Sequence, residues 1–164
     1  MKARFAVSAS VVLAAIASFA PIMNSVVSAK PSGIFQKLSG TWRGSGHIKL
    51  AGGNSQRINC RAYYNIKDSG SGIGFAIRCA SPDNKIELRA RIKDINGRLS
   101  GTWEERTFNA TGQISGTASG SLVNLTIDGA VSGSVRISYS GRHQKVSIST
   151  ATDGLRGIAI NLRR

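Results

Sequence analysis

The sequence has little of what catalytic and metal sites are made from. Its 164 residues contain only two histidines, His47 and His143, and two cysteines, Cys60 and Cys79. Neither histidine has a cysteine or carboxylate beside it in the sequence that would indicate a metal site or a nucleophilic triad. No C-x-x-C pair is present, so the common dithiol redox motif is absent. We therefore expect no catalytic residue, no metal site and no cofactor, and we predict that the protein is not an enzyme.

Acidic residues are also scarce. The chain has 8 Asp and Glu against 22 Lys and Arg, which gives a formal net charge of +14. Glu104 and Glu105 are neighbours on a predicted strand, so their side chains face opposite sides and do not form a catalytic pair. Glu105 has the inward parity, which we interpret as a position at a barrel rim or beside a cation. A buried acid that holds a polar ligand is the alternative.

Long apolar runs are confined to the N-terminus. Lys2 and Arg4 precede an apolar stretch at 5–20, and Val27-Ser28-Ala29 supplies the small residues of a signal-peptidase site. The stretch is short for a membrane span, so we expect cleavage rather than a retained anchor. We divide the chain into a signal peptide (1–29), a lead-in segment (30–39) and a single domain (40–164). Cleavage removes two basic residues and no acidic one, leaving a net charge of +12 on a periplasmic or secreted protein.

The rest of the chain has the pattern of β-structure. After one short helical turn at 34–38, apolar and polar residues alternate with period two, and turn signals such as Asn96-Gly97 recur. We predict an all-β fold of about ten antiparallel strands in an up-and-down meander. Closure into a barrel removes the exposed sheet edges, so we favour a closed barrel, with a β-sandwich as the alternative.

One pairing register satisfies both the turns and the alternation. A turn at 68–71 places Tyr64 opposite Phe75 and Cys60 opposite Cys79, and the following turns place Ala90 opposite both Phe75 and Trp103. Because export leads to an oxidising compartment, we predict a disulfide between Cys60 and Cys79. The chain-entropy model gives such a bond roughly 3 kcal/mol of stabilisation.

The predicted inner face mixes large and very small side chains. Its larger members, with the acid described above, are our candidate lumen residues: Trp42, Tyr64, Phe75, Trp103, Tyr139 and Glu105. Glycine and alanine occupy many of the other inward positions. These small residues either let the strands bend around a packed core, which we favour, or leave a lumen that accepts an apolar ligand.

The predicted outer face is basic over the first half of the domain. The register pairs Arg78 with Glu87 and Arg89 with Glu104, and it sets Arg61 beside Arg78, a like-charge contact that an anion would relieve. Our candidate anion-binding residues are Arg61, Arg78, Arg89, Arg91 and Lys93. A plain solvated charged face is the alternative.

Short motifs resemble those of known barrels. The first predicted strand begins within Leu38-Ser39-Gly40-Thr41-Trp42, and the same five residue types recur in the same order at 99–103. This G-x-W resembles the start of calycin barrels (lipocalins, avidins and fatty-acid-binding proteins), where the tryptophan closes one barrel end; only Gly40 and Trp42 carry over. The segments at 60–64 and 78–81 are similar to those of small exported alphaproteobacterial proteins. The signal peptide, the early G-x-W and the single disulfide together resemble periplasmic inhibitor barrels of the avidin-like type.

These features lead to three hypotheses about function. The first is a non-catalytic barrel that binds an anionic envelope lipid or glycan through its basic outer face, with peripheral membrane contact. The second, implied by the calycin resemblance, is a carrier of a small apolar ligand in the lumen. The third is a periplasmic inhibitor of an exported hydrolase. Export makes nucleic acid the least expected partner.

Overall fold

The structure is a computed structural model that describes residues 33–152 and 154–164. The predicted signal peptide at 1–29 lies outside these ranges. A short helix precedes ten strands: α1 (Ile34–Leu38), β1 (Gly40–Leu50), β2 (Ser55–Lys67), β3 (Gly72–Ala80), β4 (Lys85–Ile95), β5 (Arg98–Glu105), β6 (Ala110–Ser119), β7 (Leu122–Gly129), β8 (Gly133–Ser140), β9 (His143–Thr150) and β10 (Leu155–Arg163). Within the described ranges, no helix is long and apolar enough to cross a membrane.

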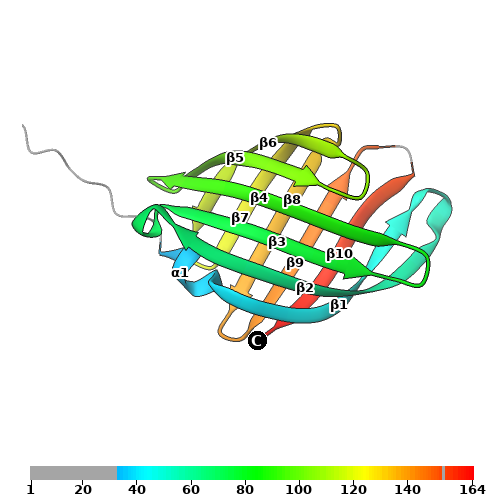
Figure 1. The fold of residues 1–164 in the computed structure, drawn as a ribbon, viewed down its shortest axis with the longest axis horizontal. Coiled ribbons are helices and arrows are strands. Elements are labelled where there is room, and N and C mark those ends of the chain that lie inside the picture. The colour runs from blue at the N-terminus through cyan, green and yellow to red at the C-terminus, as the bar shows by residue number, and fades with distance from the viewer. Residues whose placement is uncertain (1–32, 153) are drawn as a thin grey trace, which may run out of the picture.

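The ten strands close into a barrel, as Figure 1 shows. Each strand pairs antiparallel with the next along the chain, and β10 pairs with β1. Every described strand therefore has two neighbours and the sheet has no free edge, which is the physical advantage of closure. The predicted all-β closed barrel is confirmed, and the alternative of a β-sandwich is wrong.

The predicted register is also confirmed. Tyr64 lies opposite Phe75, Cys60 opposite Cys79, and Ala90 opposite both Phe75 and Trp103. In each strand the inward residues are those with the apolar parity, so a shift by one residue would turn the whole apolar set outward. The turns and the alternation in the sequence together fix the pairing of these neighbouring strands.

The inward glycines allow close approach of neighbouring strands. A Cβ at Gly44 would collide with the carbonyl oxygen of Asn161, and one at Gly101 would collide with the carbonyl oxygen of Arg91. A side chain at either position would therefore force the neighbouring strand to move away and change the curvature of the sheet. This favours the interpretation that the small inward residues serve strand bending.

Helix α1 closes one end of the barrel. Ile34, Phe35 and Leu38 are buried in the main core, and the indole Nε1 of Trp42 donates a 2.7 Å hydrogen bond to the carbonyl oxygen of Leu38. The guanidinium of Arg164 lies 4.7 Å from the centroid of the Trp42 ring. The predicted helical turn at 34–38 is present, and Trp42 anchors it to the barrel.

Candidate functional site: a row of arginines on the outer face

Four arginines occupy successive positions across four neighbouring strands. Arg163 on β10 lies opposite Arg43 on β1, Arg43 opposite Arg61 on β2, and Arg61 opposite Arg78 on β3. All four side chains are exposed. Adjacent strands are about 4.8 Å apart, so the set spans roughly 14 Å. We call Arg163, Arg43, Arg61 and Arg78 the arginine row.

The row exists because of strand parity and barrel closure. In β1 and β2, Arg43 and Arg61 follow the buried residues Trp42 and Cys60, and alternation turns both arginines outward. Arg163 joins them only because β10 pairs with β1. Like charges directly opposite each other on a sheet are destabilising. Each of the three arginine pairs in the row is therefore an unfavourable contact.

Among the described residues, an acidic side chain neutralises the row at the Arg78 end. Glu87 on β4 lies opposite Arg78 and accepts ion pairs from Arg78, Arg89 and Arg106 at 3.5, 3.1 and 3.5 Å. The ion pairs that join one described residue to another include none with Arg43, Arg61 or Arg163. Three of the four arginines in the row therefore have no acidic partner among the described residues.

The surroundings of Glu87 favour its charged form. Desolvation tends to raise the pKa of the carboxyl, but the positive charge of Arg78 and the hydrogen bond from Arg89 oppose it, with Arg106 adding to them. The pKa of Glu87 is lowered overall, so this carboxylate stays ionised beside the row.

Open depressions lie along the row. One, of about 570 Å³, is bordered by Arg43, Arg61 and Arg78 together with Asn59 and Thr107 among others. A second, of about 430 Å³, lies on the other side of Arg43, between Ser45, Asn161 and Arg163. Short polar side chains thus flank the guanidinium groups and leave room for a ligand beside them.

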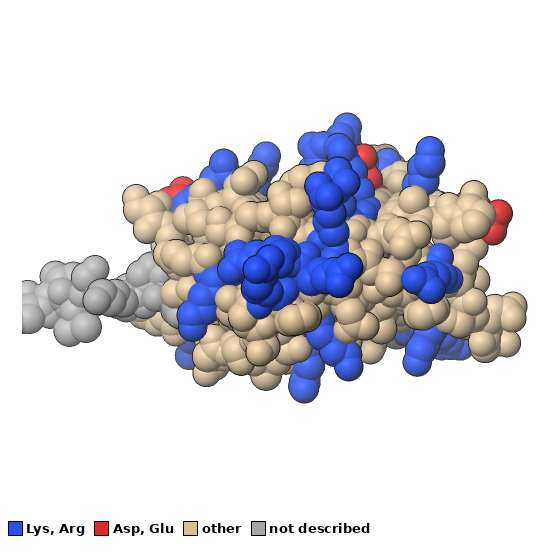
Figure 2. All heavy atoms as spheres, turned by 90° about the horizontal axis from the view of Figure 1, so that it is seen from below, with Lys and Arg blue, Asp and Glu red and all other residues tan. Residues whose placement is uncertain are grey.

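The other end of the row is also positively charged. A depression of about 710 Å³ is bordered by Thr41, Arg43, Arg142, His143, Arg163 and Arg164, and no acidic residue is in this set. His143 on β9 lies opposite Arg163 and extends the row by one strand. Figure 2 shows the side of the barrel near β1, where blue side chains gather across the middle and red ones appear only near the outline.

The predicted anion-binding residues divide into three groups. Arg61 and Arg78 lie in the row, as their register required. Arg89 lies opposite Glu104 as expected, but its ion pair goes to Glu87 on its own strand. The remaining two, Arg91 and Lys93, lie farther along β4, opposite the small residues of β3 and β5.

Sequence reasoning missed two members of the row. Arg43 has the outward parity on the first strand, so a register drawn between β1 and β2 would have predicted its pairing with Arg61. Arg163 needed the closing contact between the first and last strands. A register drawn for the closed barrel, rather than for successive hairpins alone, would have placed Arg163 beside Arg43.

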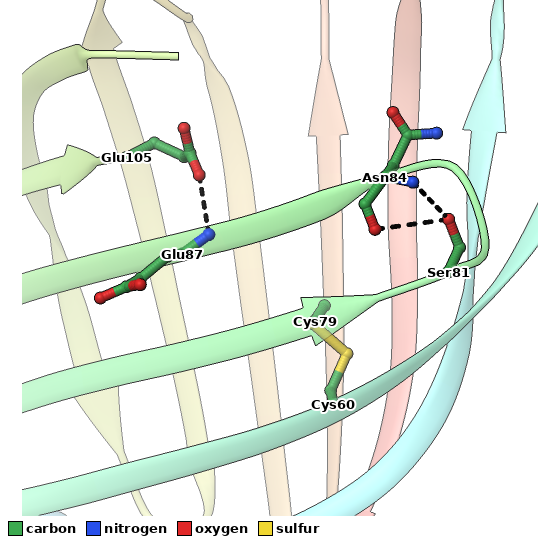
Figure 3. The surroundings of a disulfide bond; sticks show 6 residues. All are labelled: Cys60, Cys79, Ser81, Asn84, Glu87 and Glu105. Carbon is green, nitrogen blue, oxygen red and sulfur yellow. Dashed lines mark hydrogen bonds between the residues drawn. A yellow bond between two sulfur atoms is a disulfide. The ribbon is translucent and has the colours of Figure 1, made fainter. Parts of the chain in front are cut away.

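The disulfide lies beside the row. Cys60 and Cys79 are bonded, as predicted, and each is adjacent in sequence to a row arginine, Arg61 and Arg78. Figure 3 shows this bond linking β2 and β3 near the β3–β4 turn. The covalent link joins the two strands at the position where like charges face each other.

The lumen is mostly filled. Tyr64 and Phe75 pack with ring centroids 4.8 Å apart, and Trp42 meets Tyr139 edge to face at 5.9 Å. A cavity of about 110 Å³ remains, lined by aliphatic and aromatic side chains and the buried disulfide. Pockets for drug-sized ligands are usually about 300–1,000 Å³, so this space suits only a very small apolar molecule.

Buried polar groups in the lumen are paired with one exception. Tyr64 Oη donates to Gln144 Oε1 at 3.1 Å, and Gln144 Nε2 donates back at 2.9 Å. Trp103 Nε1 is the one buried side-chain nitrogen or oxygen of the described residues without a partner. It faces Gly112, where a Cβ would come within 2.5 Å of the indole nitrogen.

The side chain of Glu105 is bonded to backbone amides. Its carboxylate is buried and accepts hydrogen bonds from the backbone N–H groups of Glu87 and Phe108, both at 2.7 Å. Figure 3 shows the bond from Glu87. The sequence predicts Glu105 at a barrel rim or beside a cation. In the structure it is the last residue of β5. Its partners are backbone amides, which satisfy the hydrogen-bonding needs of a buried carboxylate as a cation would. In the portion of the chain that is described, no group of three or more His, Cys, Asp or Glu could hold a metal ion.

Comparisons with known proteins identify the fold and no family. No family model matches the sequence, and no curated protein matches it. The crystal structure of Rv2717c from M. tuberculosis is similar, with a TM-score of 0.60, 14% identity and coverage of 82% of this chain and 99% of that one. The S-type phycobiliprotein lyase CPES from Guillardia theta is similar with a TM-score of 0.56, 13% identity and coverage of 88% and 98%. These likenesses show that the chain shares its barrel fold with both structures.

Proposed function

We propose that this protein is a non-catalytic barrel that binds an anionic component of the cell envelope through the arginine row. The observation that carries the proposal is the alignment of Arg163, Arg43, Arg61 and Arg78 on four neighbouring strands. Their mutual repulsion disfavours the free protein, and a bound anion relieves it. Binding thus gains from contacts and from the loss of repulsion.

The chemistry of the row suits phosphate, sulfate or carboxylate groups. Guanidinium groups form paired, charge-assisted hydrogen bonds with such oxyanions and keep their charge at any physiological pH. A single small anion would contact one or two of the arginines. A row of roughly 14 Å suits a ligand that presents several anionic groups, such as an acidic glycan or a charged lipid surface.

The cellular location of the protein is also part of the proposal. The signal-peptide pattern at 1–29 and a disulfide bond both suit an oxidising compartment outside the cytoplasm. In that compartment, envelope lipids and glycans are the abundant polyanions. Carriage of a larger ligand in the lumen is less favoured, because the cavity of about 110 Å³ is small.

The proposal is tested by removing three of the four arginines of the row while controlling for net charge. The variant Arg43→Gln/Arg61→Gln/Arg78→Gln loses three charges from adjacent strands. The control Arg57→Gln/Arg98→Gln/Arg136→Gln loses the same number of exposed charges from β2, β5 and β8, no two of which are neighbours.

The measurement is salt-dependent retention of the mature protein on immobilised lipopolysaccharide. The row variant is expected to elute at much lower salt than the control, because several anion contacts are lost together. If the two variants elute together, net charge alone explains retention and the assignment to the row is wrong.

A further inference from the structure

An exposed aromatic residue lies on the turn between β5 and β6. Phe108 is 70% exposed, more than Leu50 at 37% or Ile95 at 66%, the other large hydrophobic residues on the described surface. Single exposed hydrophobic residues are common on soluble proteins, so exposure alone indicates nothing. Its position and the way the turn is held are what give Phe108 significance.

Buried groups fix the turn at 106–109 to β4. The carboxylate of Glu105 accepts hydrogen bonds from the Phe108 and Glu87 backbone N–H groups, both at 2.7 Å. The backbone N–H of Arg106 donates to the Glu87 carbonyl oxygen at 2.9 Å, and the Arg106 side chain meets the Glu87 carboxylate at 3.5 Å. The turn is therefore attached to β4 through backbone and side chains, and Phe108 is presented from a well-anchored segment.

The same turn borders the arginine row. Thr107, the residue before Phe108, lines the depression of about 570 Å³ that also contains Arg43, Arg61 and Arg78. The row runs from Arg163, at the end of β10 beside α1, toward Glu87, near the start of β4 at the opposite barrel end. The turn that carries the exposed Phe108 therefore lies beside the Arg78 end of the row.

We infer that the partner of the arginine row is an anionic phospholipid at a bilayer surface, with Phe108 entering the boundary between headgroups and acyl chains. This inference rests on the proposed function and narrows its ligand. Guanidinium groups would contact the headgroup phosphates, while the ring of Phe108 would leave water for the apolar side of the interface. A soluble polyanion would use the arginines alone and leave Phe108 in water.

The experiment measures binding to two probes. The first is vesicles of phosphatidylcholine with and without phosphatidylglycerol, assayed by sedimentation. The second is soluble long-chain polyphosphate. The test variant is Phe108→Ser. The matched control is Ile95→Ser, which changes an exposed hydrophobic residue at the end of β4, at the α1 end of the barrel.

The wild-type protein is expected to bind vesicles only when phosphatidylglycerol is present. Phe108→Ser should weaken that binding about tenfold, because burial of the ring is lost, while its polyphosphate binding stays unchanged. Ile95→Ser should behave as wild type on both probes. Each row arginine changed to glutamine should weaken vesicle binding about fivefold.

A second measurement does not depend on loss of binding. Trp42 and Trp103 are buried in the core, so a tryptophan introduced by Phe108→Trp is the one whose surroundings change at a membrane. Its emission should shift to the blue on addition of phosphatidylglycerol vesicles and stay constant on addition of polyphosphate.

The outcomes separate the two proposals. If Phe108→Ser binds vesicles as well as wild type and the Phe108→Trp emission does not move, the lipid inference is wrong while anion binding by the row stands. Wild-type binding to polyphosphate but not to vesicles leads to the same conclusion. If the row variant binds both probes as wild type does, the proposed function fails as well.

Discussion

Arg43 on β1 lies directly opposite Arg61 on β2, and on its other side it lies opposite Arg163 on β10. Neither contact is neutralised by an ion pair among the described residues. A protein selected for stability alone would gain by placing an acid at one of these positions. Repulsion between exposed arginines on regular strands is therefore an argument for a ligand.

The first prediction concerns the stability cost of the row. Arg61→Gln removes repulsion with both Arg43 and Arg78, and we expect it to raise the free energy of unfolding by about 0.5 kcal/mol at low salt. Because salt screens exposed charges, the gain should shrink at high ionic strength. Urea unfolding at two salt concentrations measures both. Arg57→Gln, which faces His47 on the same pair of strands, is the control; a loss of stability for Arg61→Gln at low salt would contradict the prediction.

A second prediction concerns the carboxylate at the end of the row. Glu87→Gln removes the charge shared by Arg78, Arg89 and Arg106, so three guanidinium groups become available to an external anion. We expect the variant to need more salt than wild type for elution from immobilised lipopolysaccharide. Glu104→Gln, which removes one charge from the neighbouring strand β5, is the comparison. Equal elution of the two variants would show that Glu87 has no special relation to the site.

The disulfide gives a third prediction. Cys60 and Cys79 are 19 residues apart in sequence, and a loop of this length corresponds to roughly 3 kcal/mol in the chain-entropy model. The variant Cys60→Ala/Cys79→Ala should lose about that free energy of unfolding. A reducing agent should destabilise the wild type by a similar amount and leave the variant unchanged. If reduction destabilises the variant equally, the effect does not arise from this bond.

Much of the fold could be predicted because the hairpin turns and the apolar alternation act over short distances. Turns such as Asn96-Gly97 fix which residues of adjacent strands face each other, and parity then decides which side chains enter the core. The pair Cys60–Cys79 follows from these two constraints, and so does the Arg61–Arg78 contact. Each depends on neighbouring strands only.

Features that depend on distant parts of the chain could not be predicted in the same way. Arg163 reaches Arg43 only through the closing contact of β10 with β1. Gln144 has the inward parity, but its partner Tyr64 is 80 residues away and lies across the lumen. The carboxylate of Glu105 found backbone amides of its own turn and of β4, and the sequence alone contains no signal for that geometry.

The pair formed by Tyr64 and Gln144 leads to the last prediction, which concerns alkaline pH. Burial raises the pKa of the Tyr64 phenol, and the hydrogen bond with Gln144 lowers it by a smaller amount. In the unfolded chain the phenol ionises near its ordinary pKa of 10.0. Above that pH the folded state therefore keeps a proton that the unfolded state releases. The contribution of Tyr64 to the free energy of unfolding is fully present below about pH 10 and is lost as the pH rises further.

Ultraviolet absorbance of tyrosinate and circular dichroism followed together measure this coupling. The absorbance difference between wild type and Tyr64→Phe should appear only as the barrel unfolds. Tyr64→Phe leaves the buried Gln144 amide unpaired and should cost about 1–3 kcal/mol at neutral pH, yet its stability should fall less steeply at alkaline pH. Adding Gln144→Leu should recover part of the loss, because both polar groups are then removed from the core. If Tyr64 ionises while the barrel remains folded, water reaches the phenol and the lumen is more open than its packing indicates.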